Sequence, residues 1–420
     1  MLLRFRVANH RSIRDEQELS LSATGFTEGT ARETSLSAGD RPITVLPALG
    51  IFGANASGKS NLLSALRFMR TAVRDSFVDW AKAPGKVPRE PFKLDPACGE
   101  ETTLFEVDLL LGHDPVRYTY GFELSDDRVE AEWLHAYSHG KRNVWFDREA
   151  ARGDDGGDDE FVFRGTGFRG RRDDLVALTR PNALFLSVGA TLNDPQLAVV
   201  HHWFTDNLRL VAPGGDVAKR TRWTQWLLAG PKWSDDHRDR VVRLLAAADL
   251  GLTGIDVDHD GGGLKLRHRA PGGAEVAMDF HAEESAGTHA WFGLLGYLLT
   301  TLDTGSVLLV DDLDSGLHPG LVAEVVRIFQ DLDSNPRGAQ LIFTTHDATL
   351  LGNAVLDRPL TPEQAWIATK CRSGETELYA LTDAKPRKEE NLELGYLRGR
   401  YGGIPRITAG QVARELREPS

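Results

Sequence analysis

One stretch of the chain has the residue types and spacing of a phosphate-binding loop. Residues 53–60 read Gly-Ala-Asn-Ala-Ser-Gly-Lys-Ser and match the pattern G-x-x-x-x-G-K-S/T. Glycine at both positions permits backbone angles that turn amide N–H groups inward, and a following helix adds the positive end of its dipole. We expect Lys59 to reach the β- and γ-phosphates of ATP and Ser60 to coordinate Mg²⁺. The predicted phosphate contacts come from Gly53, Asn55, Ala56, Ser57, Gly58, Lys59, Ser60 and Asn61. The alternative is a surface glycine turn.

A second stretch supplies the carboxylates that such a loop needs. Residues 307–312 read Val-Leu-Leu-Val-Asp-Asp, which predicts a buried strand that ends in two acids. We expect Asp311 to hold Mg²⁺ through water and Asp312 to act on the attacking water. Many ATPases of this architecture have Glu at the second position. Asp312 is one methylene shorter, so we expect slow hydrolysis or a need for tight closure. A helix-capping or surface acid is the alternative for Asp312.

A histidine follows another apolar strand. His346 comes after residues 341–343, Leu-Ile-Phe, and two threonines. At the end of a neighbouring parallel strand it would hydrogen-bond the γ-phosphate or orient the attacking water, which makes it a second candidate catalytic residue. A structural histidine at a strand end is the alternative.

A further candidate anion site lies at residues 285–288, Ser-Ala-Gly-Thr, before an apolar helix. Ser285 is a natural helix cap, while the small residues, including Gly287, leave backbone amides open before Thr288. One chain cannot easily place two phosphate-binding segments on one γ-phosphate, but two chains arranged head to tail can. The segment therefore predicts a homodimer, or a higher homo-oligomer, with shared ATP sites; a simple helix cap is the alternative.

Hydrophobic periodicity indicates the elements that position these residues. It predicts strands near the start and at 48–52, a helix over 61–73, and a β-meander over 102–163. The last third alternates helix 288–300, strand 307–310, helix 320–331 and strand 340–344, which favours a parallel sheet flanked by helices. We expect an N-terminal lobe at 1–164, a compact, mainly helical insertion at 165–280 and a C-terminal lobe at 281–420. No sustained heptad pattern predicts a coiled-coil arm.

Composition limits the remaining functions. The net charge is −12, there are two distant cysteines, and no apolar run approaches the length of a membrane span. We expect a cytoplasmic protein that makes no membrane contact. Basic runs at 164–172 and 385–388 leave nucleic acid open as a partner, although solvated loops explain them equally simply. Asp256, Asp258 and Asp260 would be the cation cluster of a nucleic-acid-cleaving enzyme, or else the edge of a solvated hairpin.

The four motifs, in this order and spacing, resemble the ABC-ATPase head of SMC-like and OLD-like proteins. Residues 53–60 are similar to the Walker A loop, 307–312 to Walker B, 285–288 to the signature motif, His346 to the switch histidine and 315–318 to the D-loop. The resemblance implies an α/β fold: a P-loop NTPase with a mixed sheet flanked by helices, an antiparallel β-subdomain and the insertion.

A closer resemblance is to bacterial AAA ATPases of the RloA or abortive-infection AbiL kind. It is carried by residues 9–13, 53–61, 313–319, 343–347 and 377–405. It implies that Arg11 and Ser12 lie near the nucleotide. It also implies a role in anti-phage defence beside a separately encoded effector of the RloB type.

Three functional hypotheses stay open at this point. The first is an ATP-driven switch that closes as a head-to-tail dimer and reports its state to a partner. The second is an enzyme that processes nucleic acid itself. The third is a catalytically weak ATP sensor or scaffold, which the short side chain of Asp312 suggests.

Overall fold

The computed structural model describes most of the chain. The described residues are 1–23, 31–38, 41–83, 85–138, 140–151, 158–165, 167–211, 217–248, 251–258, 263–353, 357–387, 390–405 and 410–416. Asp260 of the predicted cation cluster, and Thr166 and Lys388 of the two basic runs, lie outside the described residues.

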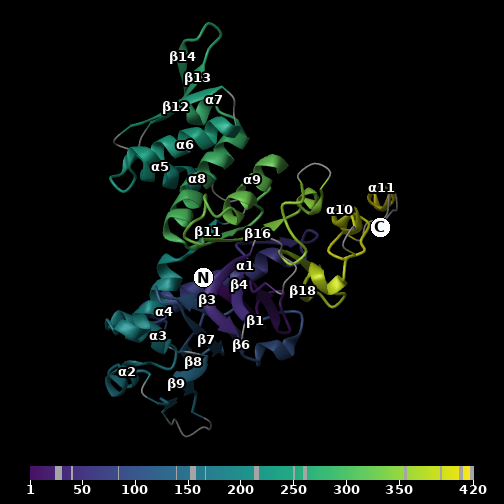
Figure 1. The fold of residues 1–420 in the computed structure, drawn as a ribbon. Coiled ribbons are helices and arrows are strands. Elements are labelled where there is room, and N and C mark those ends of the chain that lie inside the picture. The colour runs from purple at the N-terminus through teal and green to yellow at the C-terminus, as the bar shows by residue number, and fades with distance from the viewer. Residues whose placement is uncertain are drawn as a thin grey trace.

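A six-stranded sheet forms the centre of the molecule, with strand order β11-β15-β16-β5-β17-β18 (Figure 1). All neighbouring strands pair in parallel except β17 and β18, which form an antiparallel hairpin. The strands are β5 (Ala48–Phe52), β11 (Leu208–Val211), β15 (Val307–Val310), β16 (Gln340–Thr345), β17 (Ala365–Lys370) and β18 (Thr376–Ala380).

Both faces of this sheet are covered, which explains why its strands are apolar at consecutive positions. One face packs against α1 (Lys59–Asp75), and the other packs against α8 (Ala286–Thr304) and α9 (Pro319–Gln330). In β15, for example, Val307 and Leu309 belong to the first core, whereas Leu308 and Val310 belong to the second.

A seven-stranded antiparallel sheet, of order β10-β9-β8-β7-β6-β1-β2, shares the first core with α1. Its strands are β1 (Leu2–Ala8), β2 (Gln17–Ser20), β6 (Thr103–Leu111), β7 (Val116–Leu124), β8 (Val129–Ser138), β9 (Lys141–Glu149) and β10 (Glu160–Val162). The predicted meander over 102–163 is confirmed as this antiparallel subdomain. A separate hairpin consists of β3 (Arg32–Ala38) and β4 (Arg41–Val45).

The interval 165–280, predicted to form one insertion, is divided between two parts of the molecule (Figure 1). Helices α2 (Arg172–Leu178), α3 (Phe185–Thr191) and α4 (Pro195–Asp206) contribute to the first core, and β11 is an edge strand of the central sheet. The part above the sheet consists of α5 (Val217–Ala229), α6 (Asp235–Ala248), β12 (Leu252–Val257), β13 (Leu264–Arg269), β14 (Glu275–Asp279) and α7 (Phe280–Glu283). Apolar side chains such as Phe204 and Leu208 pack in the first core, so the first half of the interval packs with α1 and the antiparallel sheet.

The chain ends in short helices, α10 (Leu392–Leu397) and α11 (Gln411–Glu415). Short 3-10 helices occur at Trp80–Lys82, Pro96–Gly99, Ala348–Leu351 and Leu381–Ala384. Within the described ranges, none of the helices combines the length and the apolar character that a membrane crossing requires.

Candidate nucleotide-binding site

The predicted phosphate loop connects β5 to α1, and its backbone has the angles that such a loop needs. Gly58 caps α1 in the left-handed region with φ 101°, and Ala56 has φ 62°. A Cβ on Gly58 would lie 1.9 Å from the Thr376 hydroxyl oxygen, so this position admits only glycine without a shift of β18. The backbone angles at these two positions are therefore of the kind that a phosphate-binding loop needs.

Lys59 is held in the loop by short contacts. Its ammonium group donates to the carbonyl oxygens of Gly53, at 2.8 Å, and Ala54, at 3.1 Å, and lies 3.3 Å from the His346 ring nitrogen Nε2. Burial lowers the pKa of Lys59, while the carboxylates of Asp312 and Asp311 oppose that shift. The cation thus lies at the first turn of α1 among the catalytic candidates.

Ser60 and Asp311 lie close together although they are 251 positions apart. The Ser60 hydroxyl donates to Asp311 Oδ1 at 3.0 Å, and the Thr344 hydroxyl donates to the same oxygen at 2.5 Å. A hydroxyl and a carboxylate are hard oxygen donors, and Mg²⁺ is usually bound by one or two protein oxygens with phosphates and water completing the shell. Ser60 and Asp311 therefore fit a Mg²⁺ site next to a bound nucleotide.

Asp312 and His346 face each other at the ends of β15 and β16. His346 Nε2 lies 3.5 Å from Asp312 Oδ1, and both side chains are partly exposed. Asp312 has φ 51°, and its backbone N–H donates to the Thr344 hydroxyl at 2.7 Å. Burial and the nearby Asp311 raise the pKa of Asp312, with His346 and Lys59 acting in the opposite direction. A raised pKa makes this carboxylate a better proton acceptor.

The strand order explains why these distant positions meet. β15, β16 and β5 are parallel neighbours, so their carboxyl ends lie at one edge of the sheet. That edge is where open α/β sheets bind their ligands.

The Ser285 segment forms a separate hollow. Ser285 caps α8: its hydroxyl accepts from the Thr288 N–H at 3.1 Å and lies 2.9 Å from the Thr288 hydroxyl. Ser285, Gly287 and Thr288 line a cavity of about 410 Å³ together with Gly316, Leu317 and His318. The signature-like and D-loop-like segments therefore adjoin each other, and residues of α6, β12, α8 and α9 complete the lining.

The N-terminal residues implied by the resemblance lie in the turn between β1 and β2. The Ser12 hydroxyl accepts from the Asn61 amide at 2.6 Å, so it lies directly beside the phosphate loop. The Arg11 side chain forms an ion pair with Glu90 at 2.8 Å. Arg11 has φ 53°, and its N–H donates to the Glu90 carbonyl.

Thr344 and Thr376 are site residues that the sequence reasoning did not single out. The Thr344 hydroxyl donates to the Asp311 carboxylate and accepts the Asp312 backbone N–H. Its place before His346 at the end of an apolar strand was the signal available in the sequence. Thr376 begins β18 and had no such signal.

Among the described residues, no group of three His, Cys, Asp or Glu side chains could hold a metal ion. The predicted cluster of Asp256, Asp258 and Asp260 stays a prediction, because Asp260 lies outside the described residues.

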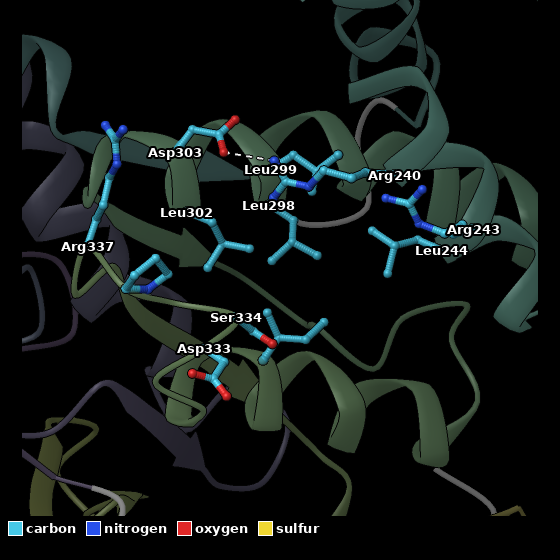
Figure 2. Close-up of a pocket in the computed structure, with 12 residues that line it drawn as sticks. Arg240, Arg243, Leu244, Leu298, Leu299, Leu302, Asp303, Asp333, Ser334 and Arg337 are labelled. Atoms are coloured by element: carbon cyan, nitrogen blue, oxygen red, sulfur yellow. Dashed lines mark hydrogen bonds and ion pairs between the residues drawn. The ribbon is translucent and has the colours of Figure 1, made fainter. Parts of the chain in front are cut away.

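Another hollow lies away from this edge (Figure 2). It has a volume of about 500 Å³, and its lining includes Leu298, Leu299 and Leu302 from α8. On one side of it Arg240 forms an ion pair with Asp303 at 2.9 Å, so this acid already has a positively charged partner. The hollow contains none of the predicted nucleotide residues, and the sheet edge is the stronger candidate site.

The sheet order, the phosphate loop and the paired acids define an ABC-type ATPase head. The chain belongs to the AAA family described as "AAA domain, putative AbiEii toxin, Type IV TA system", which matches residues 49–195 and 231–352. The predicted fold class is confirmed, as is the broader prediction of an AAA-family ATPase.

Several solved SMC heads are similar to the chain. A head bound to the C-terminal winged-helix domain of ScpA is 14% identical with a TM-score of 0.47, covering 91% of this chain and 99% of that one. The SMC head from Thermotoga maritima is 11% identical with a TM-score of 0.42, and the match covers 90% of this chain and 98% of that one. A third structure is a head with an extended coiled coil, bound to a ScpA C-terminal domain derived from Pyrococcus furiosus. It is 12% identical with a TM-score of 0.42, and the match covers 91% of this chain and 97% of that one. No curated protein sequence matches the chain.

Proposed function

We propose that this protein binds ATP with Mg²⁺, hydrolyses it slowly, and uses the cycle to close and open a head-to-tail dimer. The observation that carries the proposal is the position of Ser60 and Asp311, with oxygens 3.0 Å apart beside a phosphate loop whose Gly58 has no room for a Cβ. Such an arrangement serves phosphate and Mg²⁺ binding, and no structural need of the fold explains it.

Each residue has a distinct task in the proposed reaction. Lys59 and the loop amides bind the β- and γ-phosphates, and Ser60 and Asp311 hold Mg²⁺, which neutralises phosphate charge. Asp312 accepts a proton from the attacking water, and His346 orients that water or the γ-phosphate. The raised pKa of Asp312 supports the proton-accepting role, and its short side chain supports slow turnover.

The dimer completes the site. Ser285, Gly287 and Thr288 would offer the amides of α8 to the γ-phosphate bound by a second copy. The hollow that they share with 316–318 supports an interface at this face, because both segments would then contact the partner together. A third copy has no role in this arrangement.

The wider role is taken from the closer resemblance and the family description. We infer a cytoplasmic anti-phage ATPase of the RloA or AbiL kind, which controls a separately encoded effector of the RloB type. The AbiEii name in the family description and the partner-bound SMC heads are consistent with a defence role and with a protein partner. The second candidate is an ATP sensor with little turnover, which the shorter side chain of Asp312 favours.

Equilibrium binding and light scattering test the proposal. Wild-type protein should bind Mg-ATP and double its mass on binding, whereas Lys59→Ala should lose both properties. Lys82→Ala is the matched control because Lys82 is exposed and pairs with Asp79 on the surface. Wild-type protein that binds no Mg-ATP would overturn the proposed function, and a mass independent of ATP would remove the switch.

A further inference from the structure

A chain of hydrogen bonds connects the phosphate loop to the β1–β2 turn and to β18. The side-chain amide of Asn61 (Nδ2) donates to the Ser12 hydroxyl at 2.6 Å, and the Ser12 and Thr376 hydroxyls lie 2.7 Å apart. The Thr376 hydroxyl in turn donates to the carbonyl oxygen of Ser57 at 2.9 Å. Three segments that are distant in sequence, the β1–β2 turn, the loop and β18, thus meet in one continuous relay.

The direction of this relay follows from counting hydrogens. A hydroxyl has one hydrogen to donate. Thr376 uses its hydrogen on the Ser57 carbonyl, which can only accept, so the hydrogen between the two hydroxyls comes from Ser12. Ser12 accepts from the Asn61 amide at its other side. In this one arrangement each of the three bonds has a donor and an acceptor, and such chains strengthen their members.

The last bond fixes the orientation of one peptide unit. The Ser57–Gly58 peptide is trans, so its C=O and N–H point in opposite directions. Because Thr376 binds the carbonyl from the β18 side, the Gly58 N–H points to the other side, away from β18. Loop amides such as this one are the groups that bind phosphate in proteins with this motif.

We propose that Thr376 is a positioning residue of the nucleotide site, whose hydroxyl orients the Gly58 N–H toward a bound phosphate. The inference rests on the proposed function, because it assigns Thr376 a role in that same site. Burial supports it: Thr376 is 4% exposed, and a Cβ on Gly58 would meet both the Thr376 and Ser12 hydroxyl oxygens. Thr376 also has its N–H bonded to the Ser12 carbonyl at 2.7 Å, so its backbone is held independently of the hydroxyl.

The test compares the binding of Mg-ADP by variants that separate the hydroxyl from the side-chain volume. Thr376→Val keeps the volume and leaves the Ser57 carbonyl without a donor, so the Kd should rise about tenfold, which corresponds to about 1.4 kcal/mol. Thr376→Ser keeps the hydroxyl and should stay within about twofold of wild type. Ser12→Ala leaves the final bond intact and should raise the Kd less than Thr376→Val does.

Unfolding measured without nucleotide distinguishes positioning from a general packing role. A purely structural role would lower stability and leave the Kd of the folded fraction unchanged, which would overturn the inference. Thr376→Ser binding as weakly as Thr376→Val would overturn it too. Thr376→Ala removes the same hydroxyl and repeats the test if the valine variant does not fold. If wild type binds Mg-ADP and all variants bind equally, only this inference fails; if wild type binds neither Mg-ATP nor Mg-ADP, the proposed function fails as well.

Discussion

Replacing Thr344 by valine, which nearly keeps the side-chain volume, should damage the site through the loss of two hydrogen bonds. The Thr344 hydroxyl donates to Asp311 Oδ1 at 2.5 Å and accepts the Asp312 N–H at 2.7 Å, and the residue is fully buried. Valine has nearly the same shape but leaves an acid and a backbone amide without this partner. Asp312 would also lose a bond that holds it at φ 51°.

The magnitude follows from the two bonds. A hydrogen bond to a charged group contributes about 1.5–3 kcal/mol and a neutral one about 1 kcal/mol, so their joint loss costs about 3 kcal/mol. If that energy appears wholly in the barrier to hydrolysis, the single-turnover rate falls about 150-fold. If the two hydrogen bonds also stabilise the nucleotide-free protein, the variant loses that part of the energy as a lower free energy of unfolding.

Single-turnover ATP hydrolysis and urea unfolding measure the two parts together. The control is Thr301→Val, which removes a buried hydroxyl that bonds to the Tyr297 carbonyl within α8. This control should leave the hydrolysis rate near that of wild type, because its hydroxyl bonds within α8, and should lower the free energy of unfolding by about 1 kcal/mol. A Thr344→Val protein with wild-type hydrolysis and wild-type stability would refute the placement of Thr344 between the two acids.

Two other predictions concern proton equilibria. Asp312→Asn should retain Mg-ATP binding but hydrolyse about 100-fold more slowly in a single turnover, because the amide cannot accept a proton; equal rates would remove Asp312 from the mechanism. His10 packs against Phe68 and Phe105, and burial lowers its pKa from 6.5 to about 4. The unfolded chain therefore binds this proton more readily, and up to about 3 kcal/mol of stability, present above pH 6.5, should be lost as the pH falls toward 4. Urea unfolding of wild type and His10→Phe between those pH values checks this, and identical pH dependences would contradict it.

Local patterns were sufficient to predict the strands and loops that carry the reacting groups. The run from Val307 to Val310 is apolar because the strand is buried on both faces, and the acids follow where the strand leaves the core. The glycines at 53 and 58 are required by backbone conformation and close contact, so they are visible in the sequence itself.

Other features depend on contacts that no local pattern encodes. Thr376 bonds to Ser57 across 319 positions, and an isolated threonine at the start of a strand carries no sign of such a partner. The strand β11 was missed for a similar reason: residues 208–211 are short and lie among helices, and their strand conformation comes from pairing with β15. The predicted meeting of Ser285 with Lys59 concerns two molecules and stays a prediction.

Mixing two inactive variants measures the shared ATP site most directly. Lys59→Ala lacks the phosphate-binding cation but keeps Ser285, whereas Ser285→Arg keeps Lys59 but has its capping segment blocked. A mixed dimer contains one complete site, made from Lys59 of one chain and Ser285 of the other. A mixed dimer has one of the two sites intact, so equal mixing predicts about a quarter of wild-type ATPase activity if the chains pair at random and up to about half if only mixed dimers close. A mixture as inactive as its components, from variants shown to be folded, would contradict a site shared between two chains.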